Sequence, residues 1–176
     1  YTNAHATFLF QPGAQVPSCL DLKSVLDHVP KLLFLTASTF TTEHVAGLRG
    51  VAEEYKAQGV EKIIVLLTAL AHERQDHTFT APDGSTIPQV TMLKVIIDVL
   101  ADSTIDGGIL VQPHSLRPIE FALLRGFPLL PIDAFKYMVE RAELTSIKNP
   151  FVLGPDKGRK DEARMLAAYL RCPLGT

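Results

Sequence analysis

Charged and polar side chains gather in a long stretch that follows one of the apolar runs of the sequence. Arg74, Gln75 and Asp76 stand next to one another there, within residues 71–85, which show no apolar periodicity. A guanidinium presents a planar set of donors to phosphate oxygens, and an amide can both donate to and accept from the edge of a base. Asp76 can hold Arg74 or a metal ion. Long connections of this kind are often functional, although a solvated surface loop has a similar composition.

Two further connections carry possible ligands. His114 comes shortly after the apolar run 108–111, where it can ligate a metal ion or contact a phosphate. It can equally be structural, with Ser115 starting a helix. Asp156 lies in the segment 154–160, GPDKGRK, whose glycines allow close approach of the backbone and whose carboxylate suits Mg²⁺. An ordinary strand–turn–helix connection has the same composition.

Composition and missing motifs exclude several classes of protein. Neither a Gly-x4-Gly-Lys-Ser/Thr P-loop nor a Gly-x-Gly-x-x-Gly dinucleotide motif occurs in the sequence. The two cysteines, Cys19 and Cys172, are too few for a disulfide framework or a four-thiolate metal site. A net charge of −2 gives no strong attraction to nucleic acid or an anionic membrane, and no apolar run approaches the ~20 residues of a membrane span. We therefore expect a cytoplasmic protein with reduced thiols and with neither nucleic acid nor membrane as a partner.

The elements that position these connections follow from an alternation of short apolar runs and amphipathic stretches. The apolar runs predict buried strands at residues 6–10, 32–35, 62–67, 108–111 and 151–153. The amphipathic stretches predict helices at residues 43–58, 89–101, 132–144 and 160–170. Alternation of this kind predicts βαβ units and a parallel sheet covered on both faces. Ligands of such sheets bind at the carboxyl ends of the strands, which is where all three connections lie.

The stretch 43–58 is an amphipathic helix with recognisable end signals. Thr41 or Thr42 can cap its start and Gly59 can close it. Its apolar residues recur at spacings of three and four. This spacing places four of them on one face of the helix, namely Val45, Leu48, Val51 and Tyr55. At the other end of the chain, Asn149-Pro150 is a turn signal and an expected domain boundary.

The three connections, in this order, resemble the ribose-phosphate pyrophosphokinase family, whose members are also called phosphoribosyl-pyrophosphate (PRPP) synthetases. Arg74-Gln75-Asp76 matches an Arg-Gln-Asp motif, and His114 matches the histidine of an Asp-Leu-His motif. Residues 154–159 resemble a Ser-Pro-Asp-x-Gly-Gly motif. The segment 33–39 looks like the family's strand and Ser/Thr-rich loop before its first long helix, so the resemblance runs from about residue 31 to the end.

The resemblance implies a fold, a domain organisation and a reaction. The fold is α/β, a three-layer αβα arrangement with a mostly parallel sheet of the phosphoribosyltransferase-like kind. Residues 1–149 are expected to form the N-terminal domain, and residues 150–176 a strand and helix that begin a second, similar domain. The family transfers diphosphate from Mg-ATP to ribose 5-phosphate and so makes PRPP for nucleotide biosynthesis.

Site residues, cofactors and partners are implied in the same way. Arg74, Gln75 and Asp76 would bind ATP, and His114 and Asp156 would hold Mg²⁺. The cofactors are thus Mg²⁺ and ATP, and the second substrate is ribose 5-phosphate. The family forms homo-oligomers, so we expect at least a dimer, in which residues 127–131 lie either at a subunit contact or in the core.

Departures from the family pattern leave two functions open. Gln112 stands where the family has an aspartate, Arg159 replaces a glycine, and residues 69–73 replace an aromatic-rich stretch. The catalytic lysine loop, the acidic ribose-phosphate loop and an Asp-Gly-Glu motif are absent from these 176 residues, and catalytic residues stay unassigned. The first function is a ribose-phosphate diphosphokinase, or part of one. The alternative is a catalytically inactive PRPP-synthetase-associated or regulatory scaffold that binds a partner chain or a nucleotide.

Overall fold

The structure is a computed structural model that describes residues 3–8, 28–74, 79–87, 91–155 and 160–175. It divides into two compact units, Tyr1–Asp133 and Ala134–Thr176, which are described separately below. We call them unit 1 and unit 2. The domain boundary expected after residue 149 stays a prediction.

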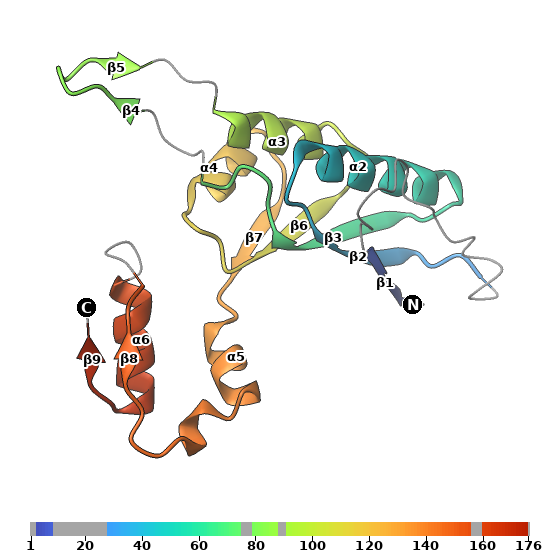
Figure 1. Cartoon of the computed structure of the whole chain (residues 1–176). Coiled ribbons are helices and arrows are strands. Elements are labelled where there is room, and N and C mark those ends of the chain that lie inside the picture. Colours follow the sequence, from blue (N-terminus) through green and yellow to red (C-terminus); the bar gives the residue numbers. More distant parts are fainter. Residues whose placement is uncertain (1–2, 9–27, 75–78, 88–90, 156–159, 176) are drawn as a thin grey trace. The chain divides into compact units, whose positions relative to one another are not determined.

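Unit 1 is built on a sheet of five parallel strands in the order β1-β2-β3-β6-β7 (Figure 1). The strands are β1 (Asn3–Phe8), β2 (Leu32–Ser38), β3 (Lys62–Ala69), β6 (Gly107–Val111) and β7 (Leu129–Ile132). Leu35 of β2 pairs with Val65 of β3, and Leu66 of β3 pairs with Ile109 of β6. Strands of this sheet that follow one another along the chain are therefore neighbours in space.

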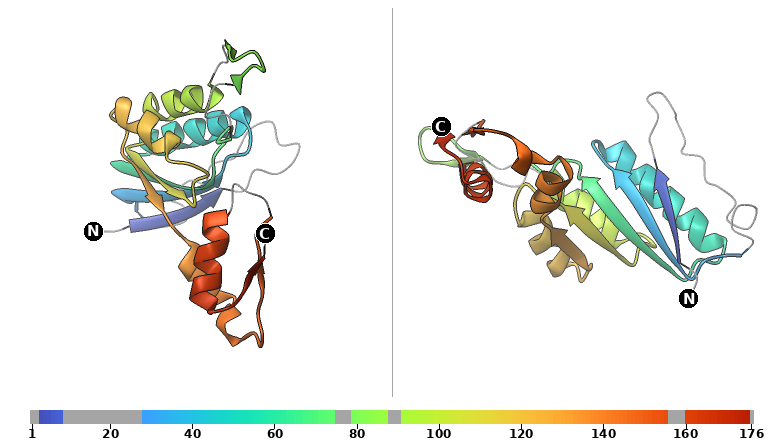
Figure 2. Two further views of the ribbon diagram at one scale, coloured as in Figure 1. Left: turned by 90° about the vertical axis from the view of Figure 1, so that its left-hand side faces the viewer. Right: turned by 90° about the horizontal axis from the view of Figure 1, so that it is seen from below.

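Three helices cover one face of this sheet, namely α2 (Thr42–Ala57), α3 (Met92–Ala101) and α4 (Arg117–Leu124), as Figures 1 and 2 show. Right-handed crossovers between strands in sequential order place successive helices on the same side. The fold class expected from the sequence, α/β with a parallel sheet flanked by helices, is confirmed. A second helical layer is not among the described residues of unit 1.

The core of unit 1 lies between the sheet and these helices. Alternate residues of β2 are buried against the helices, including Leu33 and Leu35, which are fully buried. The residues between them, such as Phe34, are partly exposed on the opposite face. The helices contribute large, fully buried apolar side chains to the core, among them Leu48, Leu93, Ile96, Ile97 and Leu100.

Helix α2 begins and ends where the sequence predicts. Thr41 is the N-cap, and its hydroxyl accepts a hydrogen bond of 3.3 Å from the backbone N–H of His44. Gly59 follows the helix with a φ of +103°, a conformation that side-chain-bearing residues rarely adopt. All four residues of the predicted apolar face, Val45, Leu48, Val51 and Tyr55, are buried.

Several elements differ from the sequence-based expectation. The stretch after β3 contains a short antiparallel hairpin, β4 (Phe79–Thr80) and β5 (Thr86–Ile87), rather than an unstructured loop. Strand β7 was not expected as an element, and α4 corresponds only to the helix that Ser115 was considered able to start. The helix expected at residues 132–144 is shorter, because β7 extends to Ile132 and the helix α5 (Phe135–Arg141) starts after it.

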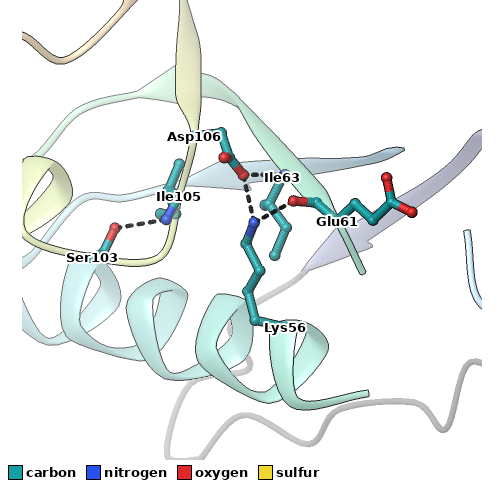
Figure 3. Close-up of polar contacts among 6 residues, drawn as sticks. All are labelled: Lys56, Glu61, Ile63, Ser103, Ile105 and Asp106. Carbon is teal, nitrogen blue, oxygen red and sulfur yellow. Dashed lines mark hydrogen bonds and ion pairs between the residues drawn. The ribbon is translucent and has the colours of Figure 1, made fainter. Parts of the chain in front are cut away.

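An ionic cluster closes the amino ends of β3 and β6 (Figure 3). The carboxylate of Asp106 accepts hydrogen bonds from Lys56 Nζ at 2.7 Å and from the backbone N–H of Ile63 at 2.8 Å. Lys56 Nζ also donates to the carbonyl of Glu61 at 2.7 Å. Partial burial acts to raise the pKa of Asp106, but the two hydrogen bonds and the charge of Lys56 outweigh it, so the pKa lies below its ordinary value. This cluster stabilises the edge of the sheet opposite the loops that follow β2, β3 and β6.

Unit 2 contains α5, a 3₁₀ turn (Leu144–Ser146) and a small βαβ arrangement. Strands β8 (Val152–Leu153) and β9 (Leu174–Gly175) pair in parallel, and α6 (Lys160–Leu170) connects them. A small apolar core joins them, formed by Val152, Ala163 and Ala167. The strand and helix expected at residues 151–153 and 160–170 are thus present as β8 and α6. None of the helices among the described residues is both long and apolar enough to span a membrane.

Candidate functional site at the carboxyl edge of the sheet

The carboxyl ends of β2, β3 and β6 meet at one edge of unit 1, because these strands are parallel and adjacent. Three loops begin there, at residues 39–41 after β2, 70–74 after β3 and 112–116 after β6. Arg74 belongs to the second loop and His114 to the third, and both side chains are exposed. The two predicted ligand residues that the structure describes therefore lie on neighbouring loops.

A hydrogen bond joins the loop after β3 to the loop after β6. The carboxylate Oε1 of Glu73 accepts it from the backbone N–H of His114, 41 residues further along the chain. Because Arg74 follows Glu73 directly, this contact places the backbone of Arg74 beside the loop that carries His114. A guanidinium and an imidazole thus emerge from adjoining loops.

Polar contacts also join the loop after β3 to the start of α2. His72 Nε2 lies 3.1 Å from the hydroxyl of Thr42. The hydroxyl and the N–H of Thr39 both donate to the carbonyl of Ala69, at 2.9 and 3.0 Å. Beside them, the hydroxyls of Ser38 and Thr68 are hydrogen bonded. The loop after β3 is therefore held on both of its sides.

Two residues at this edge have a left-handed backbone without being glycine. His72 has a φ of 58° and Gln112 a φ of 49°. Such conformations are uncommon for residues with a side chain, and they cluster at ligand-binding and catalytic sites. The side-chain Oε1 of Gln112 is also buried without a hydrogen-bond partner among the described residues. Strain and an unsatisfied polar atom at the same edge are features expected of a ligand site.

The other predicted site residues are not placed by the structure. Gln75, Asp76 and Asp156 lie outside the described residues. No group of three or more histidine, cysteine, aspartate or glutamate side chains able to hold a metal ion occurs among the residues that the structure describes. The metal ligands implied by the resemblance, His114 and Asp156, therefore stay a prediction, as do Gln75 and Asp76 as contacts of a nucleotide.

The sequence alone did not identify three polar residues at this edge as candidate site residues. They are Thr42, His72 and Glu73. His72 and Glu73 were assigned no role, although they belong to the polar stretch 71–85 and depart from an aromatic-rich family pattern. Thr42 was considered only as a possible helix cap. No local pattern pairs them with residues 30 and 41 positions away. For His72 and Glu73, the signal that was available is their place directly before Arg74, at the carboxyl end of a predicted strand; Thr42 carries no such signal.

The fold resembles that of a known class of enzymes. A solved structure described as phosphoribosylpyrophosphate synthetase from Mycobacterium smegmatis superimposes with a TM-score of 0.61 over 81% of this chain and 46% of that chain, at 17% sequence identity. Similarity at this level of identity shows the fold. The chain thus has a PRPP synthetase-like α/β fold.

Sequence comparison adds homology to the shared fold. The chain is 30% identical over 142 residues to the ribose-phosphate pyrophosphokinase of Saccharolobus solfataricus, covering 81% of this chain and 45% of that protein. It is 27% identical over 130 residues to the ribose-phosphate pyrophosphokinase of Sulfolobus acidocaldarius, covering 74% of this chain and 41% of that protein. No protein-family model matches the sequence. The chain is a distant homologue of the ribose-phosphate pyrophosphokinases, and it spans less than half the length of these relatives.

Proposed function

We propose that the chain binds Mg-ATP at the carboxyl edge of the unit 1 sheet, as part of a ribose-phosphate diphosphokinase-like protein. In this proposal Arg74, Gln75 and Asp76 contact ATP, while His114 and Asp156 hold Mg²⁺. The observation that carries it is the hydrogen bond from the N–H of His114 to Glu73, which joins the loop of Arg74 to the loop of His114. The homology to ribose-phosphate pyrophosphokinases supports it independently.

The chemistry of diphosphate transfer suits these groups. The attacked phosphorus of ATP is surrounded by negatively charged oxygens, so catalysis consists mainly of positioning and charge neutralisation. The net charge of the chain is −2, so the attraction must come from a local arrangement and not from the whole protein. An exposed guanidinium and an exposed imidazole on adjoining loops, together with a bound metal ion, would supply that local attraction. The acceptor in the proposed reaction is ribose 5-phosphate.

The second candidate function is a catalytically inactive scaffold that binds a partner chain, including a second copy of itself. It is favoured by an apolar stripe near α4, where Leu116, Leu123 and Leu124 are 63%, 78% and 81% exposed. Spacings of seven and eight residues place the two helical leucines on the same side of the helix as Leu116. Exposed apolar side chains gathered in this way are typical of protein interaction surfaces.

Calorimetry separates the two candidates, and an activity assay tests the expected effect of the missing loops. Isothermal titration calorimetry with ATP, in the presence and absence of Mg²⁺, should show saturable binding that requires the metal. The lysine and acidic ribose-phosphate loops of the family are absent from the 176 residues, so we expect no AMP release from this chain incubated with Mg-ATP and ribose 5-phosphate. The absence of any ATP binding would favour the scaffold, whereas AMP release that depends on ribose 5-phosphate would contradict our view of the missing loops.

A further inference from the structure

We propose that Glu73 is a positioning residue, which holds the loops of Arg74 and His114 in the arrangement that binds the triphosphate. The inference rests on the proposed function. It concerns a residue at which this sequence departs from the aromatic-rich stretch that precedes the Arg-Gln-Asp motif in the family. Its basis is the hydrogen bond from the His114 backbone N–H to the Glu73 carboxylate.

The loop after β3 is the middle one of the three loops at this edge, because β3 lies between β2 and β6 in the sheet. Two consecutive residues of that loop, His72 and Glu73, contact the segments on its two opposite sides. His72 lies 3.1 Å from Thr42, at the start of α2, whereas Glu73 contacts the loop after β6. The left-handed backbone at His72, with a φ of 58°, is the turn at which the two side chains diverge.

These contacts fix the backbone directly before Arg74, the first of the proposed nucleotide contacts. Arg74 follows Glu73 directly, so holding the Glu73 side chain limits the positions that the guanidinium can reach. The same hydrogen bond holds the backbone of His114, two residues after the left-handed Gln112. Groups held in place before a ligand arrives lose less freedom when it binds, and placement errors of about 1 Å can weaken a site strongly.

The proposed role requires a hydrogen-bond acceptor at position 73 and not a negative charge. A carboxylate near a bound triphosphate would repel it, so its presence is useful only through the bond that it accepts. Glutamine presents a carbonyl oxygen at the same distance along the side chain and can accept the same bond. We therefore expect Glu73→Gln to behave like the wild type, and Glu73→Ala to lose the connection between the loops.

Amide hydrogen exchange followed by NMR tests the connection directly and needs no nucleotide. The backbone N–H of His114 should exchange about tenfold faster in Glu73→Ala than in the wild type, and within about threefold of the wild-type rate in Glu73→Gln. Glu61→Ala is the matched control, since the side chain of Glu61 forms an exposed ion pair with Lys31 at 2.9 Å, and its loss should leave this rate unchanged. An unchanged exchange rate in Glu73→Ala would overturn the proposal.

Calorimetry with Mg-ATP then tests the consequence for binding. Glu73→Ala should bind about tenfold more weakly, the factor that corresponds to 1.4 kcal/mol, with Glu73→Gln and Glu61→Ala within about threefold of the wild type. If Glu73→Ala binds as tightly as the wild type while Arg74→Ala does not, the role of Glu73 is wrong and the proposed function stands. If the wild type itself fails to bind, both are overturned.

Discussion

Asp106 should contribute measurably to the stability of unit 1. Its carboxylate accepts hydrogen bonds from Lys56 Nζ at 2.7 Å and from the N–H of Ile63 at 2.8 Å (Figure 3). The substitution Asp106→Asn removes the negative charge but keeps an oxygen that can accept from Ile63. What it tests is therefore the charged part of the interaction with Lys56.

The magnitude follows from the burial of the pair. A hydrogen bond between charged groups contributes about 1.5–3 kcal/mol. The side chains of Lys56 and Asp106 are 24% and 28% exposed, so solvent screens part of this energy. We expect Asp106→Asn to lower the free energy of unfolding by about 1–2 kcal/mol at pH 7.

The pH dependence has a defined sign. The pKa of Asp106 is lowered in the folded protein, so its contribution is fully present above the unfolded pKa of about 3.9 and is lost as the pH falls through the folded value. The difference between wild type and Asp106→Asn should accordingly be constant from pH 7 to pH 5 and shrink below about pH 4.

Urea unfolding monitored by circular dichroism measures this difference. The control is Glu61→Gln, which removes one charge of the exposed ion pair with Lys31, whose side chains are 60% and 61% exposed. Such a pair contributes about 0–1 kcal/mol. Equal unfolding free energies for wild type and Asp106→Asn at pH 7, or a difference that grows as the pH falls below 4, would refute the reasoning.

Two further predictions concern core packing and the glycines within and directly after helix α2. Leu100→Ala, at a fully buried position in α3, should lower the free energy of unfolding by about 2–5 kcal/mol, whereas Leu124→Ala, at a position that is 81% exposed, should change it by less than about 0.5 kcal/mol. Gly59→Ala should destabilise by about 1 kcal/mol or more because of the φ of +103°. Gly50→Ala, within α2 and with nothing within 4 Å of the added Cβ, should stabilise by about 0.5–1 kcal/mol. Urea unfolding checks all four, and changes of the same sign at both glycines would contradict the glycine argument.

Periodicity and end signals in the sequence were enough to predict the main elements of unit 1. The buried face of α2 and its Thr41 cap follow from spacing and residue type alone. The central strands were predicted because β2 and β3 are apolar runs bounded by polar residues. Since parallel strands with helical connections place ligand sites at one edge, the neighbouring positions of Arg74 and His114 could also be inferred.

The rest depended on contacts that a local pattern does not record. Strand β7 contains Pro131 and exposed apolar residues, which resemble a loop or contact segment in sequence. Its pairing with β6 tolerates the proline because β7 lies at the edge of the sheet. Likewise, the bond between Glu73 and the backbone of His114 joins residues 41 positions apart, and only the register of β3 and β6 brings them together.

The most direct test of the proposed nucleotide site is the affinity for Mg-ATP of the wild type, of Arg74→Ala and of a matched control. Arg49→Ala is the control, because Arg49 lies on the surface of α2 and pairs with Glu53 at 2.7 Å. Loss of one charged phosphate contact should weaken binding by about 1.5–3 kcal/mol, or roughly 10- to 100-fold. We predict this loss for Arg74→Ala and wild-type affinity for Arg49→Ala. Equal affinity of the wild type and Arg74→Ala would contradict the assignment of this edge as the nucleotide site.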